Sequence, residues 1–128
     1  MRILTFVILS AFVVPLDAQM VKTALDAIVR TDKEYFNKYF APQITFTIDQ
    51  NEQTVSKEQA IEKIKAFVMA SNIRSNKIIH EGITKGKDAY MGIGSLIADK
   101  AKFRVYISYK TMDGNKLIHE LKFEKDIL

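Results

Sequence analysis

His119 and Tyr109 are the two side chains of this sequence whose types could combine in acid–base chemistry. His119 shares the apolar face of an alternating stretch, residues 116–124. If the stretch 102–111 is its antiparallel neighbour, Tyr109 lies opposite His119 or one pair away. A buried imidazole beside a phenol could transfer protons. The same pair also fits a core histidine whose ring nitrogens are satisfied by Tyr109 or a backbone carbonyl, and we favour this interpretation because no inward carboxylate is expected to orient the imidazole.

The other candidates for chemistry are weaker. Ser95 is the one hydroxyl expected on the inner face of its strand, and no Gly-x-Ser-x-Gly elbow surrounds it. His80 points inward only if the turn near Gly86 has two residues, whereas a three-residue turn points Glu81 inward. No zinc-type spacing is present, and the strands of His80 and His119 are expected about 14 Å apart. We therefore expect neither a metal site nor a cofactor.

The N-terminal half carries the signals of helices. Apolar residues at helical spacing predict a helix over about 20–30. Two capping boxes, Thr-x-x-Glu from Thr31 and Ser-x-x-Gln from Ser56, predict the starts of two more helices. Between them, the alternation at 44–48 predicts a strand, which a polar loop over 49–53 follows.

The C-terminal half changes to a period of two. Strands are expected near residues 77–85, 89–98, 102–111 and 116–124. The turns between them are short, so these strands form an antiparallel meander. The resulting order is α-α-β-α-β-β-β-β. It predicts an α+β domain whose three helices pack on one face of a strongly curved antiparallel sheet.

The turn lengths decide which residues face the helices. A three-residue loop after Met112 would point odd-numbered residues of both flanking strands inward. A similar loop around Lys100 would point Met91, Ile93 and Ile97 inward. The outer face would then carry the interface candidates Tyr90, Leu96, Tyr106 and Ile118. Such residues indicate either a docking surface or the scattered apolar groups of an ordinary sheet.

Several segments together resemble a known family. They are Tyr39-Phe40, Ser56–Ala60, His80–Gly82, Ala89–Leu96, Phe103–Ile107 and Ile118–Phe123. Over about 21–124 the chain resembles the domain of unknown function 4783, a group of small exported bacterial proteins. The resemblance implies the cystatin-like cone of the nuclear-transport-factor-two-like superfamily. That family has no assigned reaction, and the wider superfamily contains isomerases, dehydratases and binding modules, so the fold does not select an activity.

The first eighteen residues have the layout of a secretory signal peptide. A positive start at Arg2 precedes an apolar run over 3–14, which Pro15 ends, and Ala18 offers a small residue for cleavage. The run is about twelve residues, shorter than the roughly 20 that cross a bilayer. We expect a leader over 1–18, a periplasmic or secreted single domain over 19–128, and no stable membrane anchor after cleavage.

Composition narrows the function. The chain has a net charge of +4 and no cysteine, so its stability depends on packing. Its lysines are not clustered, and export argues against a nucleic-acid partner. We expect a non-catalytic exported domain that binds an unidentified small molecule or protein, with a homodimer through the outer sheet face as one form. The alternative is a small pocket enzyme of the isomerase or hydratase type that uses His119 and Tyr109.

Overall fold

The computed structural model of the chain describes residues 16–83 and 89–126. Most of the expected leader and the turn near Gly86 lie outside these residues. The elements are α2 (Leu16–Arg30), α3 (Lys33–Tyr39), β1 (Phe40–Ile48), β2 (Asn51–Ser56), α4 (Lys57–Ser71), β3 (Ile73–Ile83), β4 (Ala89–Ala98), β5 (Lys102–Met112) and β6 (Asn115–Lys125).

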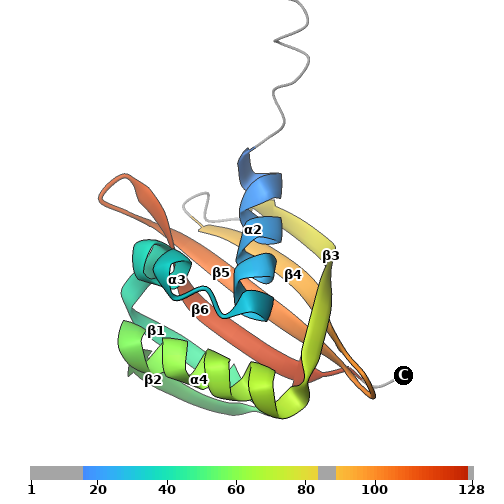
Figure 1. Ribbon diagram of the computed structural model, residues 1–128. Coiled ribbons are helices and arrows are strands. Elements are labelled where there is room, and N and C mark those ends of the chain that lie inside the picture. Colours follow the sequence, from blue (N-terminus) through green and yellow to red (C-terminus); the bar gives the residue numbers. More distant parts are fainter. Residues whose placement is uncertain (1–15, 84–88, 127–128) are drawn as a thin grey trace, which may run out of the picture.

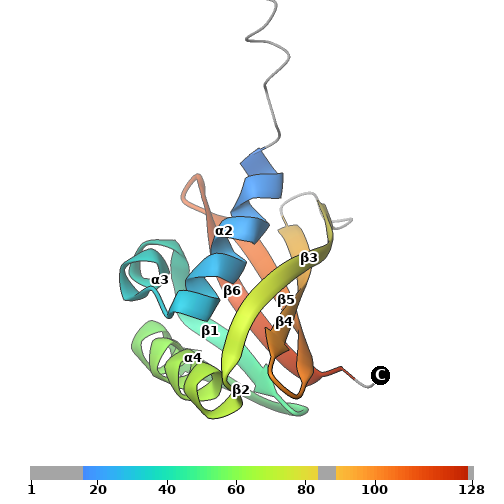
Figure 2. The same cartoon turned by 45° about the vertical axis from the view of Figure 1, so that its right-hand side comes forward.

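All six strands form one sheet in the order β2-β1-β6-β5-β4-β3. The strands pair antiparallel except β1 and β6, which run parallel. The sheet curves around the helices, which lie on its concave side (Figures 1 and 2). A single apolar core fills the space between the two layers. The structure therefore confirms the α+β class and the three helices packed on a curved sheet.

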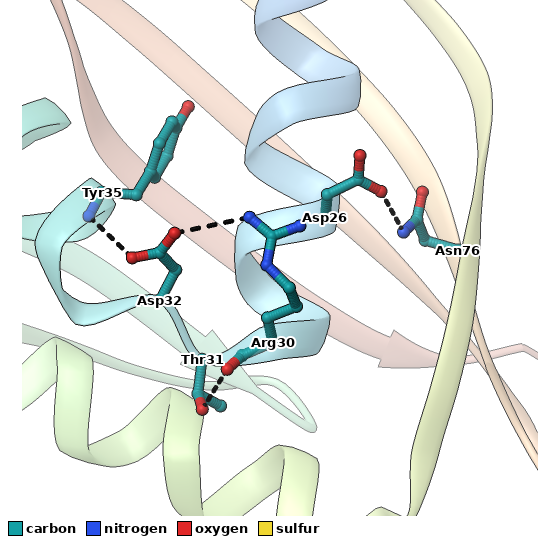
Figure 3. Close-up of polar contacts among 6 residues, drawn as sticks. All are labelled: Asp26, Arg30, Thr31, Asp32, Tyr35 and Asn76. Carbon is teal, nitrogen blue, oxygen red and sulfur yellow. Dashed lines mark hydrogen bonds and ion pairs between the residues drawn. The ribbon is translucent and has the colours of Figure 1, made fainter.

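The junction between α2 and α3 is fixed by two successive residues. Thr31 has a φ of 52°, and its amide donates to the carbonyl of Ile28, which closes the end of α2. Asp32 then caps α3, because its carboxylate accepts a hydrogen bond from the amide of Tyr35 (Figure 3). The expected capping box at Thr31 is thus wrong by one residue, whereas the box from Ser56 to Gln59 at the start of α4 is confirmed.

Helix α2 packs directly on the backbone of β4. A Cβ atom built on Gly94 would lie 2.6 Å from both Cδ atoms of Leu25, and one on Gly92 would overlap Val21. Both α2 residues are fully buried. These glycines therefore allow a contact between helix and strand that no larger residue permits.

A polar contact sets the position of α2 along β3. The Asn76 side chain donates to the Asp26 carboxylate at 2.8 Å (Figure 3), and Lys22 bonds to both residues. The acceptor role holds the pKa of Asp26 below its ordinary value, against the opposing effect of partial burial.

The stretch expected as a polar loop over 49–53 is partly a strand. Asp49 and Gln50 both have positive φ, so they form a two-residue hairpin turn, after which β2 pairs with β1. Four of the six β2 residues are exposed. An exposed edge strand buries too few side chains to require apolar alternation, which explains why the sequence pattern did not reveal it.

The β5–β6 hairpin turns on two residues, not the expected three. Asp113 and Gly114 have φ of 53° and 81° and form the turn. The odd residue instead lies within β6, where Tyr109 pairs with Ile118 and Ser108 with Glu120. His119 is therefore the extra residue of a β-bulge. The bulge turns Ile118 into the core, where it is 1 % exposed, and leaves His119 off the apolar face.

The β4–β5 turn also has two residues. Ile97 pairs with Lys102 and Gly94 with Val105, so the inward set shifts by one position from that expected. Tyr90 and Leu96 face the helices and are buried, whereas Met91 and Ile93 lie on the outer face.

A bulge in β3 settles the orientation of His80 and Glu81. The pairing passes from Ile78–Gly94 to His80–Ile93, so Ile79 is the extra residue. Glu81 pairs with Gly92 and shares the face of α2, while His80 lies on the outer face and is exposed.

Candidate functional site

The described residues enclose a cleft of about 790 Å³ at one end of the cone. Three elements make its walls: the start of α2, the helix α3, and the hairpin of β5 and β6, which Figure 1 shows projecting beside α3. The lining residues are Gln19, Met20, Thr23, Tyr35, Lys38, Tyr39, Tyr109, Asn115, Lys116 and Leu117.

Two tyrosines form the inner part of the cleft. Tyr109 is 2 % exposed, and its hydroxyl donates to the carbonyl of Met20 at 3.2 Å. The Tyr35 hydroxyl is hydrogen-bonded to Tyr109. This bond lowers the pKa of Tyr35, as a bond accepted by the Tyr35 oxygen does, so the Tyr109 hydroxyl contacts both the Tyr35 oxygen and the Met20 carbonyl. The two hydroxyls therefore join α3, β5 and α2.

Burial controls the ionisation of this pair. It raises the pKa of Tyr35 well above the ordinary value, and the neighbouring Tyr39 adds to the rise, while the bond with Tyr109 opposes it. Tyr35 is therefore neutral at any physiological pH. The Asp32 cap places Tyr35 in the first turn of α3, and Figure 3 shows its ring extending away from that cap.

Lysines occupy two sides of the rim. Lys38 is in the last turn of α3, with its Nζ 5.3 Å from the centre of the Tyr39 ring. Lys116 extends from β6, with its Nζ 5.3 Å from the centre of the Tyr90 ring. Among the described residues that line the cleft, none is acidic. The rim is therefore positively charged.

His119 does not join this site. It is the bulged residue of β6, so Ile118 takes the position opposite Tyr109, and His119 is not among the residues that line the cleft. Partial burial lowers its pKa, which Glu120 opposes and Lys110 reinforces. The expected acid–base pair of His119 and Tyr109 is therefore not assembled, and the one phenolic proton of Tyr109 is already bonded to a backbone carbonyl.

Comparison with known proteins assigns the chain. The family model described as "Domain of unknown function (DUF4783)" matches residues 21–124. The chain belongs to this family. No curated protein matches it in sequence.

Solved structures agree with the DUF4783 assignment. A family member from Bacteroides uniformis ATCC 8492 has 20% identity and a TM-score of 0.73, over 90% of this chain and 99% of that one. Another, from Bacteroides ovatus ATCC 8483, has 20% identity and a TM-score of 0.74, over 81% and 93%. An NTF-2 like protein of unknown function from Silicibacter pomeroyi DSS-3 has 14% identity and a TM-score of 0.64, over 85% and 92%. These similarities show the fold, including the NTF2-like cone.

The other expected site residues of this DUF4783 chain are dispersed. Ser95 is 8 % exposed but pairs with Arg104 on the outer face, away from Tyr109. Of the four interface candidates, Tyr90, Leu96 and Ile118 are buried in the core, so their placement on an outer docking surface is wrong. Tyr106 alone remains on the outer face, where Lys122 lies 5.7 Å from the ring centre.

The described residues contain neither a membrane-spanning helix nor a cluster of metal ligands. None of the helices there is both long and apolar enough to span a bilayer. No group of three or more metal-binding side chains occurs in the same part of the DUF4783 chain.

Sequence reasoning missed most of the cleft. Tyr35 and Tyr39 stand four positions apart on a short helix, which brings their rings to 4.6 Å and was a usable signal for a shared face. Asn115 and Lys116 begin a strand and carried no such signal. They reach the cleft because the two-residue turn directs this hairpin toward α3, which sequence spacing alone did not determine.

Proposed function

We propose that this DUF4783 chain is a binding domain that holds a small molecule in the cleft between α2, α3 and the β5–β6 hairpin. One observation supports this most: the inner part of the cleft consists of rings and apolar side chains whose polar atoms are already bonded within the protein. Such a surface favours an apolar body.

The proposal also includes export of the chain from the cytoplasm. The leader pattern over residues 1–18 supports a role in the periplasm or outside the cell. The strand register gives no support to the alternative isomerase or hydratase activity, because Ile118 and not His119 is paired with Tyr109.

Binding at the cleft can be tested with N-phenyl-1-naphthylamine, a neutral aromatic probe that fluoresces in apolar sites. We expect saturable binding, and we expect Thr23→Trp to weaken it at least about ten-fold, the equivalent of about 1.4 kcal/mol. Thr23 is exposed on α2 and lines the cleft, so the indole would fill the space and leave the core unchanged.

Thr54→Trp is the matched control, because Thr54 is an exposed threonine on β2, outside the cleft. It should bind the probe as the unsubstituted chain does. Absence of saturable binding, or equal loss in both variants, contradicts the proposal.

A second candidate contact is a homodimer through the outer sheet face. This face carries half-buried Met91, Ile93 and Tyr106, with Ile93 and Tyr106 directly paired across the strands. Lys122 and Glu124, which form an ion pair at 3.3 Å, supply both signs of charge beside them. Two copies related by a two-fold axis could match these charges over the apolar centre.

The dimer is tested by light scattering after size exclusion. We expect a dimer mass for the domain and a monomer mass for Tyr106→Glu, because the carboxylate would lose hydration at the centre of the interface. Lys33→Glu, an exposed change on α3, on the other side of the sheet, should leave the mass unchanged. A monomer at high protein concentration rules this contact out.

A further inference from the structure

We infer that the cleft selects an amphipathic organic anion, a ligand with an apolar body and a single carboxylate or sulfonate group. This inference rests on the proposed binding function and adds the charge and orientation of the ligand. The apolar body lies against the rings of Tyr35 and Tyr109, and the anionic group lies at the rim beside Lys38.

The inner cleft excludes the charged end of such a ligand. Tyr35 is half-buried and hydrogen-bonded to Tyr109, whose hydroxyl donates to the Met20 carbonyl. Both hydroxyls are neutral, so neither carries a positive charge to balance an anion. An anionic group placed there would lose its hydration without gaining a charged donor, which costs several kcal/mol.

Lys38 provides the charged donor that the inner cleft lacks. It lines the cleft, and its Nζ contacts only the face of the Tyr39 ring among the interactions of the described residues. An ammonium carries three protons. The contact with the face of the Tyr39 ring does not use these protons in hydrogen bonds, so they can be donated to the oxygens of an anion. The anion can approach Lys38 past the edge of the ring.

The opposite wall has the same sign of charge. Lys116 lines the cleft from β6, over the ring of Tyr90. The neutral amides of Gln19 and Asn115 lie on the same rim. With no carboxylate among the described lining residues, the potential across the mouth is positive and holds the anionic end there.

The position of Lys38 on α3 has a structural explanation as well. A cation in the last turn of a helix interacts favourably with the helix dipole. That role requires only a charge at this turn and predicts an effect on stability alone. A role in selecting anions predicts an effect on ligand preference, so the two can be separated.

The test compares two probes with the same aromatic skeleton. N-phenyl-1-naphthylamine is neutral, and 8-anilino-1-naphthalenesulfonate adds one sulfonate. We expect the sulfonate probe to bind the folded domain about ten-fold more tightly than the neutral one, and this preference to fall as salt is raised from about 0.02 M to about 0.5 M. Thr23→Trp should weaken both probes.

Lys38→Met should remove most of the preference. We expect a three- to ten-fold loss for the sulfonate probe, about the effect of one exposed charge pair strengthened by a partly dry site. The neutral probe should change less than about two-fold. Lys33→Met is the matched control, since Lys33 is exposed in the first turn of the same helix and does not line the cleft.

The outcomes distinguish the two proposals. If the neutral probe binds in the cleft but the sulfonate probe binds no more tightly, the charge preference is wrong and the binding function stands. If Lys33→Met reduces sulfonate binding as much as Lys38→Met, the probe responds to general surface charge and the inference fails. If neither probe binds, both proposals fail. Thermal unfolding of each variant identifies any loss that comes from unfolding.

Discussion

Gly94→Ala is expected to lower the free energy of unfolding by about 2–3 kcal/mol, as overpacking of a tight core does. The added methyl would lie 2.6 Å from Cδ1 and Cδ2 of Leu25 and 3.1 Å from Cγ. Leu25 is fully buried, so there is no free space into which its side chain could move to avoid the added methyl. The helix must therefore move away from β4. Urea denaturation measures the loss.

Two variants make this test specific. Gly82→Ala adds the same methyl on the same sheet, where its nearest neighbour in space is His80 Nε2 at an ordinary 3.6 Å. It should be neutral or stabilising by up to about 1 kcal/mol, through the entropy of the unfolded chain. In a Leu25→Ala background, the cost of Gly94→Ala should largely disappear. Equal midpoints for Gly82→Ala and Gly94→Ala contradict the close packing of α2.

The same contact links the fold to the cleft. Val21 packs on Gly92 one turn before Leu25, and the adjacent Met20 supplies the carbonyl that Tyr109 bonds. The distance between α2 and β4 therefore determines whether the Met20 carbonyl lies within hydrogen-bonding reach of Tyr109 in the inner cleft. A change at Gly92 or Gly94 should reach the site through α2 without touching a lining residue.

The helices and the long strands could be predicted because their signals are local. The capping box from Ser56 to Gln59 and the apolar spacing over 20–30 depend on neighbours within four positions. The resemblance to the family added the cone, which the matched family model and the similar structures confirm.

The faces of the strands could not be predicted with the same certainty. Each residue added to or removed from a turn moves every later side chain to the other face of the sheet. The sequence around Lys100 is compatible with loops of two or three residues, and the shorter loop buries Tyr90 and Leu96. Bulges at Ile79 and His119 cause two more such shifts.

The cleft could not be predicted from the sequence for a related reason. Its walls come from residues near 20, 35 and 115, and no spacing rule connects three elements so far apart. Their meeting depends on the left-handed Thr31, which directs α3 back along α2, and on the tight turn at Asp113. Both are features of one or two residues, and the alternatives to them look equally acceptable in sequence.

The bulge in β6 leads to an expected contrast between adjacent residues. Ile118→Ala should lower the free energy of unfolding by about 3 kcal/mol, because Ile118 is 1 % exposed in the core and a cavity would remain. His119→Ala should lower it by less than about 1 kcal/mol, since the half-buried imidazole lies off the apolar face. Chemical denaturation of both variants measures the difference.

Leu121→Ala serves as the reference for a core position on the same strand, because Leu121 is fully buried and pairs with Ile107 beyond the bulge. It should match Ile118→Ala within the usual spread of such substitutions. A regular strand without the bulge would put His119 and Leu121 on one face and Ile118 on the other. A large loss for His119→Ala with a small loss for Ile118→Ala would therefore restore the pairing of His119 with Tyr109 and, with it, the case for acid–base chemistry.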